Sequence, residues 1–460
     1  MRLLSLACAF ALGTAAFAAH AAKPAPAASV PGSETIVSKT LPNGLKIIVW
    51  PDHDIPSASY YTFYKAGSRN EYPGITGLAH YFEHMMFNGT TRRAPGEFDR
   101  EMEAAGGSNN ASTSNDLTIY TDWFPSSALE TIFDLEGDRM GNLAFDPKVV
   151  ESERGVVYSE RRSSVDNDNL GTLMEQMQAT AWLAHPYQFP TIGWPSDIEN
   201  WKIDDLKQFF KTYYAPNNAV LVITGDVQPA QVFALADKYL APLQRQPEPA
   251  PVTTVEPEQL GERRIVVERA DAQSPIVAYA FHSGLSASSK EQPVLELLAT
   301  ILARGESSRL HQRLVEQEQA AVDAGAFAEA GFDPGLLWIY AMLPPGGDMT
   351  KVEALLDDEL AKIARDGVTA AELDKARNLK LSAFWRGMAT INGKARALGE
   401  HEVFNGDYRK AFDAPAAFNA VTAADVQALA KKILRVQNRT TGLLKPVAAA
   451  PTSDNKEGAR

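Results

Sequence analysis

The first half of the chain combines two patterns of hydrophobic positions. Short stretches rich in β-branched and aromatic residues predict strands, and stretches with apolar residues every three to four positions predict helices. The predicted strands cover residues 45–50, 58–63, 116–123 and 219–224. The predicted helices cover residues 77–87, 95–105, 127–142, 148–163 and 204–214. This mixture of strands and helices predicts a first α+β domain of about 200 residues.

The second half repeats this order after a segment of different composition. Residues 243–262 carry four prolines among Gln and Glu, which is typical of an extended linker. Beyond it, strands are predicted around residues 264–267 and 276–281, followed by a helix at 292–302. A faint internal repeat aligns positions 205 to 218 with positions 425 to 438. We therefore predict two homologous α+β domains joined by a Pro-rich linker.

The N-terminus reads as an export signal. Arg2 precedes a mostly apolar stretch at residues 3–18, and Ala19, His20 and Ala21 form a small-x-small cleavage pattern. We predict the following organisation: signal peptide 1–21, tether 22–34, first domain 35–242, linker 243–262, second domain 263–446 and flexible tail 447–460. The single cysteine, Cys8, lies in the predicted signal peptide. A metal site in the mature chain must therefore use His and carboxylate ligands.

Length and charge narrow the classes of partner. A chain of 460 residues exceeds the usual size of one hydrophobic core, which agrees with two domains. The net charge of −13 argues against nucleic acid, because that affinity rests on clustered Lys and Arg. Beyond the N-terminus, no apolar run is long enough to span a bilayer. We expect a periplasmic or secreted protein with no nucleic-acid partner and no stable membrane anchor.

The predicted helix at 77–87 carries the sequence His-x-x-Glu-His, formed by His80, Glu83 and His84. On an α-helix, His80 and His84 lie within about 40° of each other and about 6 Å apart along the axis. Two imidazoles can then bind one metal ion. Glu83 lies about 60° from His80, where its carboxylate can serve as a base without ligating the metal. An ordinary exposed helix face is the alternative, so a third ligand is needed.

Glu160 is the candidate for that ligand. Catalytic zinc sites usually have three protein ligands and one open position, and a carboxylate is a common third ligand. Glu160 lies on the predicted helix at 148–163, and Glu153 projects from nearly the same face seven residues earlier. On composition alone, a solvated acidic face is the commoner explanation for two such residues.

A family resemblance favours the metal site. The segments 77–90, 106–111 and 153–160 resemble, in order and spacing, the pitrilysin and insulysin superfamily of zinc metallopeptidases. This superfamily includes mitochondrial processing peptidase and its bacterial relatives. The resemblance implies two domains, each a mainly antiparallel sheet covered by helices, and a clamshell-like chamber that admits peptides. It also implies one Zn²⁺ per chain, with Glu160 as the distal ligand and Glu153 in a supporting role.

The same resemblance assigns a substrate-binding segment. Asn110 and Ala111 match residues of an edge strand that pairs with the substrate backbone, which gives binding with little side-chain specificity. A polar turn at residues 108–112 is the alternative.

The second half departs from the family pattern. The helix that matches the zinc helix contains residues 296–300 and has no His. Active family members often carry an Arg, and a Tyr seven residues later, in their second half; Val315 and Val322 stand at those positions here. We therefore predict a heterodimer in which a related subunit supplies the Arg and Tyr. The alternative is a different alignment, and the candidate substitutes are Arg309, Arg313 and Tyr340.

These observations predict a zinc-dependent endopeptidase that hydrolyses unfolded peptides or small proteins as the metal-bearing subunit of a heterodimer. The alternatives are an active homodimer, a catalytically silent scaffold subunit of the same fold, and a hydrolase of non-peptide substrates. The intact motif argues against the scaffold, and the segment with Asn110 and Ala111 favours peptides.

Overall fold

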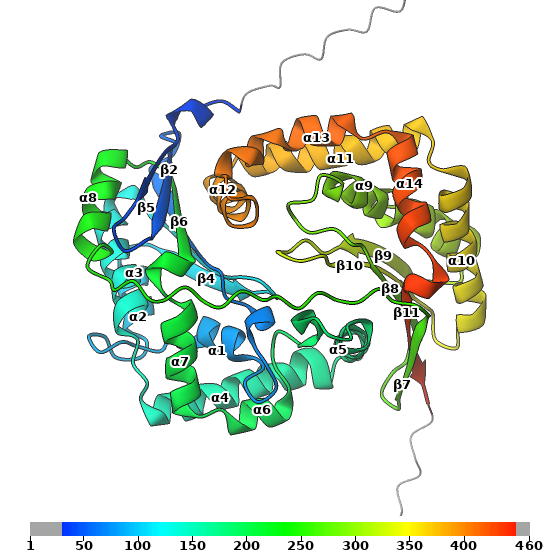
Figure 1. Cartoon of the computed structure of the whole chain (residues 1–460), viewed down its shortest axis with the longest axis horizontal. Coiled ribbons are helices and arrows are strands. Elements are labelled where there is room, and N and C mark those ends of the chain that lie inside the picture. Colours follow the sequence, from blue (N-terminus) through cyan, green and yellow to red (C-terminus); the bar gives the residue numbers. More distant parts are fainter. Residues whose placement is uncertain (1–29, 448–460) are drawn as a thin grey trace, which may run out of the picture.

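The computed structural model describes residues 30–447. The predicted signal peptide, most of the predicted tether, and all but the first residue of the predicted tail lie outside this range. Within it, the chain forms two sheets, each covered by helices (Figure 1). The predicted α+β class, with two helix-covered sheets, is confirmed.

The first half contains a six-stranded sheet in the order β1-β2-β6-β3-β5-β4. Its strands are β1 (Val37–Thr40), β2 (Lys46–Pro51), β3 (Ser57–Tyr64), β4 (Ser108–Thr113), β5 (Thr118–Pro125) and β6 (Ala219–Gly225). Its helices are α1 (Leu78–Met85), α2 (Glu97–Ala104), α3 (Leu129–Asn142), α4 (Pro147–Arg161), α5 (Asn169–Ala181), α6 (Pro195–Asn200), α7 (Ile203–Tyr213) and α8 (Pro229–Tyr239). Strand β4 forms one edge of this sheet.

The second half contains a five-stranded sheet in the order β7-β11-β8-β10-β9. Its strands are β7 (Arg263–Arg269), β8 (Ile276–His282), β9 (Asp323–Ala328), β10 (Leu336–Met342) and β11 (Arg439–Pro446). Its helices are α9 (Gln292–Ala303), α10 (Met349–Asp366), α11 (Ala370–Met388), α12 (Ile391–Asn405), α13 (Ala414–Ala420) and α14 (Ala423–Ile433). Both sheets are antiparallel except at one pair each, β2 with β6 and β7 with β11.

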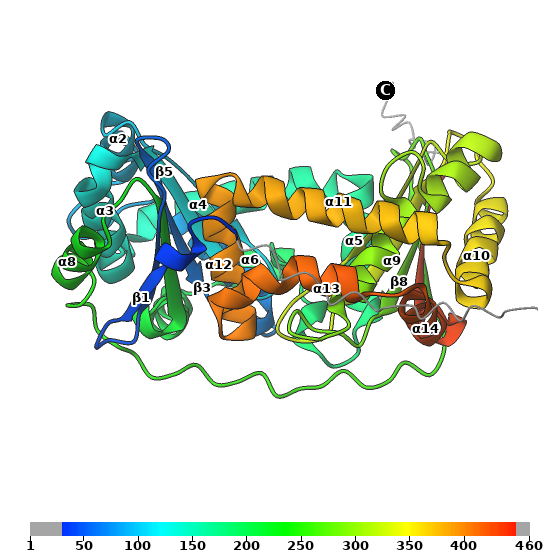
Figure 2. The same ribbon diagram turned by 90° about the horizontal axis from the view of Figure 1, so that it is seen from above.

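Each sheet is covered on one face by a helix from the other half. Alternate side chains of a strand point to opposite faces, so both faces of the central strands can be buried. Helix α12 packs on the first sheet, where Leu398 and Phe63 share one apolar cluster. Helix α5 packs on the second sheet, where Met177 and Leu444 share another. Figure 2 shows α11 and α13 running between the two halves, with α12 beside the first sheet.

Glycines allow these helices to approach closely. A Cβ atom on Gly399 of α12 would lie 2.0 Å from Cε2 of Phe63. A Cβ atom on Gly442 of β11 would lie 2.3 Å from the sulfur of Met177. Polar contacts also hold α12, because Lys46 Nζ lies 2.6 Å from a carboxylate oxygen of Glu402. Each of α5 and α12 thus covers the sheet of the other half, an arrangement we call the exchange of helices. Close packing at the glycines holds both helices, and an ion pair also holds α12.

The chain between α8 and β7 forms neither helix nor strand and crosses from one half to the other (Figure 1). Side-chain hydrogen bonds anchor the part of this segment that leads into β7. The Glu256 carboxylate accepts hydrogen bonds from the backbone N–H groups of Leu183, Ala184 and His185, at 2.7, 2.9 and 3.0 Å. Gln259 donates to the carbonyl of Arg439 at 2.7 Å.

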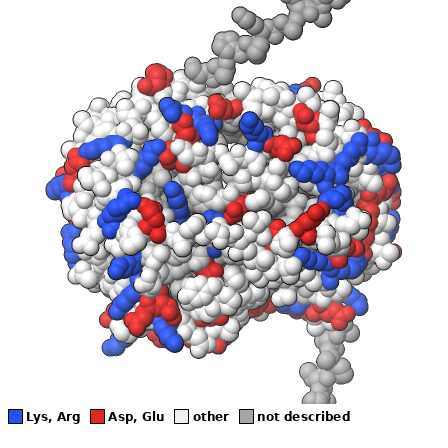
Figure 3. All heavy atoms as spheres, viewed as in Figure 1, with Lys and Arg blue, Asp and Glu red and all other residues white. Residues whose placement is uncertain are grey.

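Acidic and basic side chains are interspersed over the face of both halves drawn in Figure 3. Across the described range 30–447, no helix combines the length and the apolar character needed to cross a membrane.

Candidate metal centre

Helix α1 is fixed at its N-terminus before it presents its motif. Gly77 precedes the helix with a φ of 89°, a conformation that favours glycine. The buried carboxylate of Glu71 accepts hydrogen bonds from the N–H groups of Gly77 and Ala79, both at 2.7 Å. Burial raises the pKa of Glu71 well above its usual value. Phe82 and Met85 anchor the opposite face of α1 in the core.

The structure brings His80, His84 and Glu160 together. Each offers one ligand atom, and the three atoms lie within 4.8 Å of one another. His80 Nε2 lies 3.5 Å from Glu160 Oε1, and His84 Nε2 lies 3.2 Å from Glu160 Oε2. Two imidazole nitrogens and one carboxylate form the donor set that catalytic zinc sites use, so these residues fit a zinc ion. The Glu160 side chain is 42% exposed, which leaves the site accessible from solvent.

The surrounding charges agree with this arrangement. The hydrogen bond to His80 contributes most to a pKa of Glu160 below its usual value, with further lowering from His84. Burial lowers the pKa of His84, but contacts with Glu153 and the charges of Glu160 and Glu83 outweigh it, so the net pKa is raised. His84 and Glu160 therefore each favour the charged form because of their neighbours.

Glu153 lies behind the candidate ligands. Its Oε1 atom is 2.8 Å from Nδ1 of His84, and its side chain is 14% exposed. A carboxylate on the second ring nitrogen fixes both the orientation and the tautomer of a metal-binding histidine. The Nε2 atom of His84 is then directed toward Glu160. His80 differs, because its Nδ1 atom is buried and has no hydrogen-bond partner within the described range.

Glu83 has a partner that the sequence reasoning missed. Thr113, the last residue of β4, places its hydroxyl 2.6 Å from Glu83 Oε2. Strand alternation places Thr113 on the same face of β4 as Ala111, two residues earlier, but only the register of β4 shows that this face meets Glu83.

Asn110 and Ala111 lie in the middle of β4, so the segment 108–112 is a strand rather than a turn. Their cross-strand partners in β5 are Thr121 and Tyr120. Ala111 packs against the first core cluster, whereas Asn110 lies on the exposed face. The other side of β4 has no neighbouring strand in the sheet.

The predicted positions of the Arg and Tyr pair hold valines, and the three candidate substitutes already contact other residues of this chain. Val322 is 57% exposed, and Val315 lies in the π-helical segment His311–Gln317. Arg309 is paired with Glu372 at 2.6 Å, and Arg313 with Glu318 at 3.0 Å. The Tyr340 ring lies over Gly325, where a Cβ atom would be 2.2 Å from the ring.

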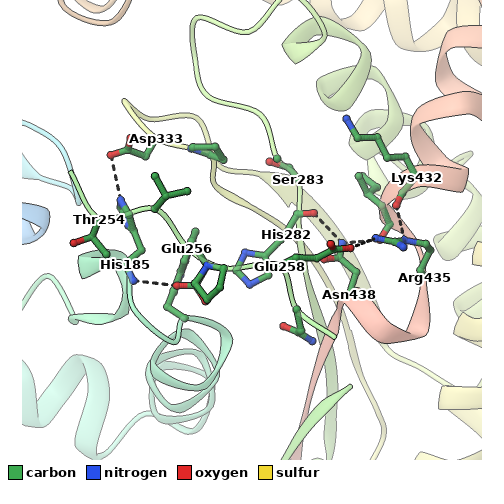
Figure 4. A pocket seen from close by; sticks show the side chains of 17 residues that line it. His185, Thr254, Glu256, Glu258, His282, Ser283, Asp333, Lys432, Arg435 and Asn438 are labelled. Atoms are coloured by element: carbon green, nitrogen blue, oxygen red, sulfur yellow. Dashed lines mark hydrogen bonds and ion pairs between the residues drawn. The ribbon is translucent and has the colours of Figure 1, made fainter. Parts of the chain in front are cut away.

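A second polar region lies where the two halves meet. A cavity of about 340 Å³ is lined by both halves and the connecting segment (Figure 4). At its wall, His185 Nε2 lies 3.2 Å from Asp333 of the second half. Asp333 also pairs with Arg69, which lies 3.2 Å from Asp116. Asp116 accepts a hydrogen bond from Tyr187, and burial raises its pKa to about 6.

Comparison with known proteins places the chain in one class, the zinc protease-like proteins of family M16. Residues 48–193 match the family model described as insulinase (peptidase family M16), and residues 200–380 match the peptidase M16 inactive domain. The chain is 32% identical over 415 residues to the zinc protease PqqE of Helicobacter pylori, with 89% of this chain and 92% of the relative covered. The chain belongs to the insulinase family of peptidases, M16, and the predicted resemblance is confirmed.

Solved structures of other proteases have the same fold as this chain. A protease from Helicobacter pylori superposes with a TM-score of 0.86 at 31% identity, covering 89% of this chain and 99% of that chain. The periplasmic protease PqqL from Escherichia coli has the same fold, with a TM-score of 0.74 at 19% identity. That match covers 93% of this chain but 51% of PqqL, so this chain corresponds in fold to about half of PqqL.

Proposed function

We propose that this chain is a zinc-dependent endopeptidase that cleaves unfolded peptides or small proteins. The observation that carries the proposal is the convergence of His80, His84 and Glu160 ligand atoms within 4.8 Å. His80 and His84 lie on α1, which also presents Glu83, and Glu160 lies on α4. The zinc protease PqqE, as a relative that covers nearly the whole chain, supports the same assignment.

His80, His84 and Glu160 would hold the zinc ion. When bound, such an ion lowers the pKa of water and polarises a carbonyl group. Glu83 takes the proton of the attacking water and passes it to the leaving amine. Glu153 orients His84 through its Nδ1 atom.

Strand β4 would bind the substrate. Asn110 and Ala111 lie on this edge strand, and a peptide in extended conformation can pair with its free backbone groups. Binding through the backbone accepts many side chains, which suits a peptidase for unfolded chains.

We also propose that a related subunit completes the active site. Val315 and Val322 lack the chemistry of an Arg and Tyr pair, and Arg309, Arg313 and Tyr340 are engaged within this chain. The match to about half of PqqL agrees with a functional unit built from two such chains. An active homodimer is the alternative. A silent scaffold remains the alternative that the name of the second family model suggests.

The test combines metal analysis with cleavage of an unstructured peptide by the wild type and by Glu83→Gln. We expect one zinc per chain in both proteins and, for Glu83→Gln, cleavage reduced to a small residual rate. Equal cleavage by both would refute Glu83 as the base. Full activity of the purified chain as a homodimer would refute the need for a second kind of subunit, and a zinc-loaded chain that is inactive with every related subunit would support the scaffold.

Export is the remaining proposal. It rests on the predicted signal peptide and on the periplasmic location named for PqqL. Cell fractionation and N-terminal sequencing of the mature chain test it: we expect a chain beginning after Ala21, and a cytoplasmic chain beginning at Met1 would refute it.

A further inference from the structure

Strand β4 contacts the candidate active site in a second way. The hydroxyl of Thr113 lies 2.6 Å from Glu83 Oε2, the short distance typical of an O–H donor and an ionised carboxylate. Within residues 30–447, Thr113 is the one side chain that donates a hydrogen bond to Glu83. The carboxylate would otherwise rotate freely, because the terminal torsion of a glutamate has a broad, shallow energy profile.

The fold holds Thr113 rigidly relative to α1. Thr113 pairs with Thr118 of β5, whose hydroxyl donates to the buried carbonyl of Ala66 at 2.9 Å. Two residues further along β5, the Tyr120 hydroxyl donates to the carbonyl of Phe82 at 2.8 Å. Because Phe82 directly precedes Glu83, the second bond ties β5 to the part of α1 that carries the carboxylate. Thr113 and Glu83 are therefore positioned by the same pair of strands.

We propose that Thr113 is a positioning residue for the reaction. Its hydroxyl binds Glu83 Oε2 and so holds the other carboxylate oxygen toward the site where His80, His84 and Glu160 converge. The proposal rests on the function proposed above, because it assigns Glu83 the role of base. A base that is misplaced by a fraction of an ångström loses much of its effect, since proton transfer requires hydrogen-bond geometry.

The position of Thr113 adds a consequence for substrate binding. Asn110, Ala111 and Thr113 share one six-residue strand, with a free edge beside them. A peptide that pairs with β4 would lie beside the strand that holds the base. Because Thr113 acts on Glu83 and not on the peptide, its contribution falls on kcat rather than on KM.

The test uses Thr113→Val, which keeps the shape of the side chain and removes the donor, and Thr113→Ser, which keeps the donor. We expect Thr113→Val to lower kcat by about 10- to 100-fold, with unchanged KM and unchanged zinc content. Thr113→Ser should retain most of the wild-type kcat. Thr91→Val is the matched control, because Thr91 is an exposed threonine outside β4.

Two further measurements distinguish a positioning role of Thr113 from a purely structural role and from failure of the proposed function. In a Glu83→Gln background, Thr113→Val should cost nothing more, because the hydroxyl acts through Glu83; a further loss there would overturn the proposal. Equal kcat for the wild type and Thr113→Val would also overturn it, as would a fall in zinc content or melting temperature large enough to account for the lost rate. If the wild type and Glu83→Gln cleave equally, the proposed function itself fails.

Discussion

Replacement of Glu153 tests whether the second carboxylate of α4 stabilises the metal centre through His84. Glu153 Oε1 lies 2.8 Å from His84 Nδ1, and its side chain is 14% exposed, so water cannot readily replace it. Loss of such an outer partner typically weakens metal binding about 10- to 100-fold, or about 1.4 to 2.7 kcal/mol. Glu153→Gln keeps an acceptor oxygen but loses the charge, so we expect about 10-fold. Glu153→Ala loses both, so we expect about 100-fold.

The assay is competition for zinc between the protein and a chelating dye, at fixed pH. Glu151→Gln is the control, because Glu151 lies on the same helix with a side chain that is 74% exposed and contacts Arg154 rather than His84. The control should bind zinc as the wild type does. If Glu153→Ala also binds zinc like Glu151→Gln, the supporting role assigned to Glu153 is wrong.

Three other predictions concern stability. Burial raises the pKa of Asp116 to about 6. Between about pH 4 and 6, Asp116 therefore keeps its proton in the folded state, whereas in the unfolded state it has lost it. Stability should fall by up to about 3 kcal/mol as the pH rises through that window, and calorimetry of Asp116→Asn should show this slope removed; an unchanged slope would contradict the shift. Gly399→Ala should lower the melting temperature, at a cost of about 1–3 kcal/mol from overpacking against Phe63, whereas Gly387→Ala, with open space around it, should not. Zinc at 100 times its Kd should stabilise the wild type by about 2.7 kcal/mol and His80→Ala far less; equal stabilisation would argue against His80 as a ligand.

Much of the fold could be predicted from local patterns. The predicted strands at 45–50 and 58–63 correspond to β2 and β3 within one residue at each end, because buried strands carry dense β-branched and aromatic residues. The spacing of His80, Glu83 and His84 placed all three on one helix, and the structure has them on α1. Glu160 could be selected through the family resemblance, because a half-exposed acid gives no signal of its own.

Contacts between distant segments could not be predicted. Nothing in the sequence of α5 or α12 states which sheet each helix covers, since an apolar helix face fits either sheet. The partnership of Thr113 with Glu83 depends on the register of β4 against β5, which a short polar strand does not specify. Arg139 is a stronger case: it reads as a surface residue, yet it is 1% exposed, with its guanidinium 2.6 Å from Glu136 and stacked over Tyr120.

The exchange of α5 and α12 limits how this molecule can move. Swinging the two halves apart about the connecting segment would strip one apolar face from each sheet at the same time, exposing Phe63 and Leu398 on one side and Met177 and Leu444 on the other. Opening such a hinge would cost more free energy than the binding of a substrate could supply. We therefore expect the two halves to move as one body, and in the proposed two-subunit enzyme the gap that admits a peptide would open between the subunits.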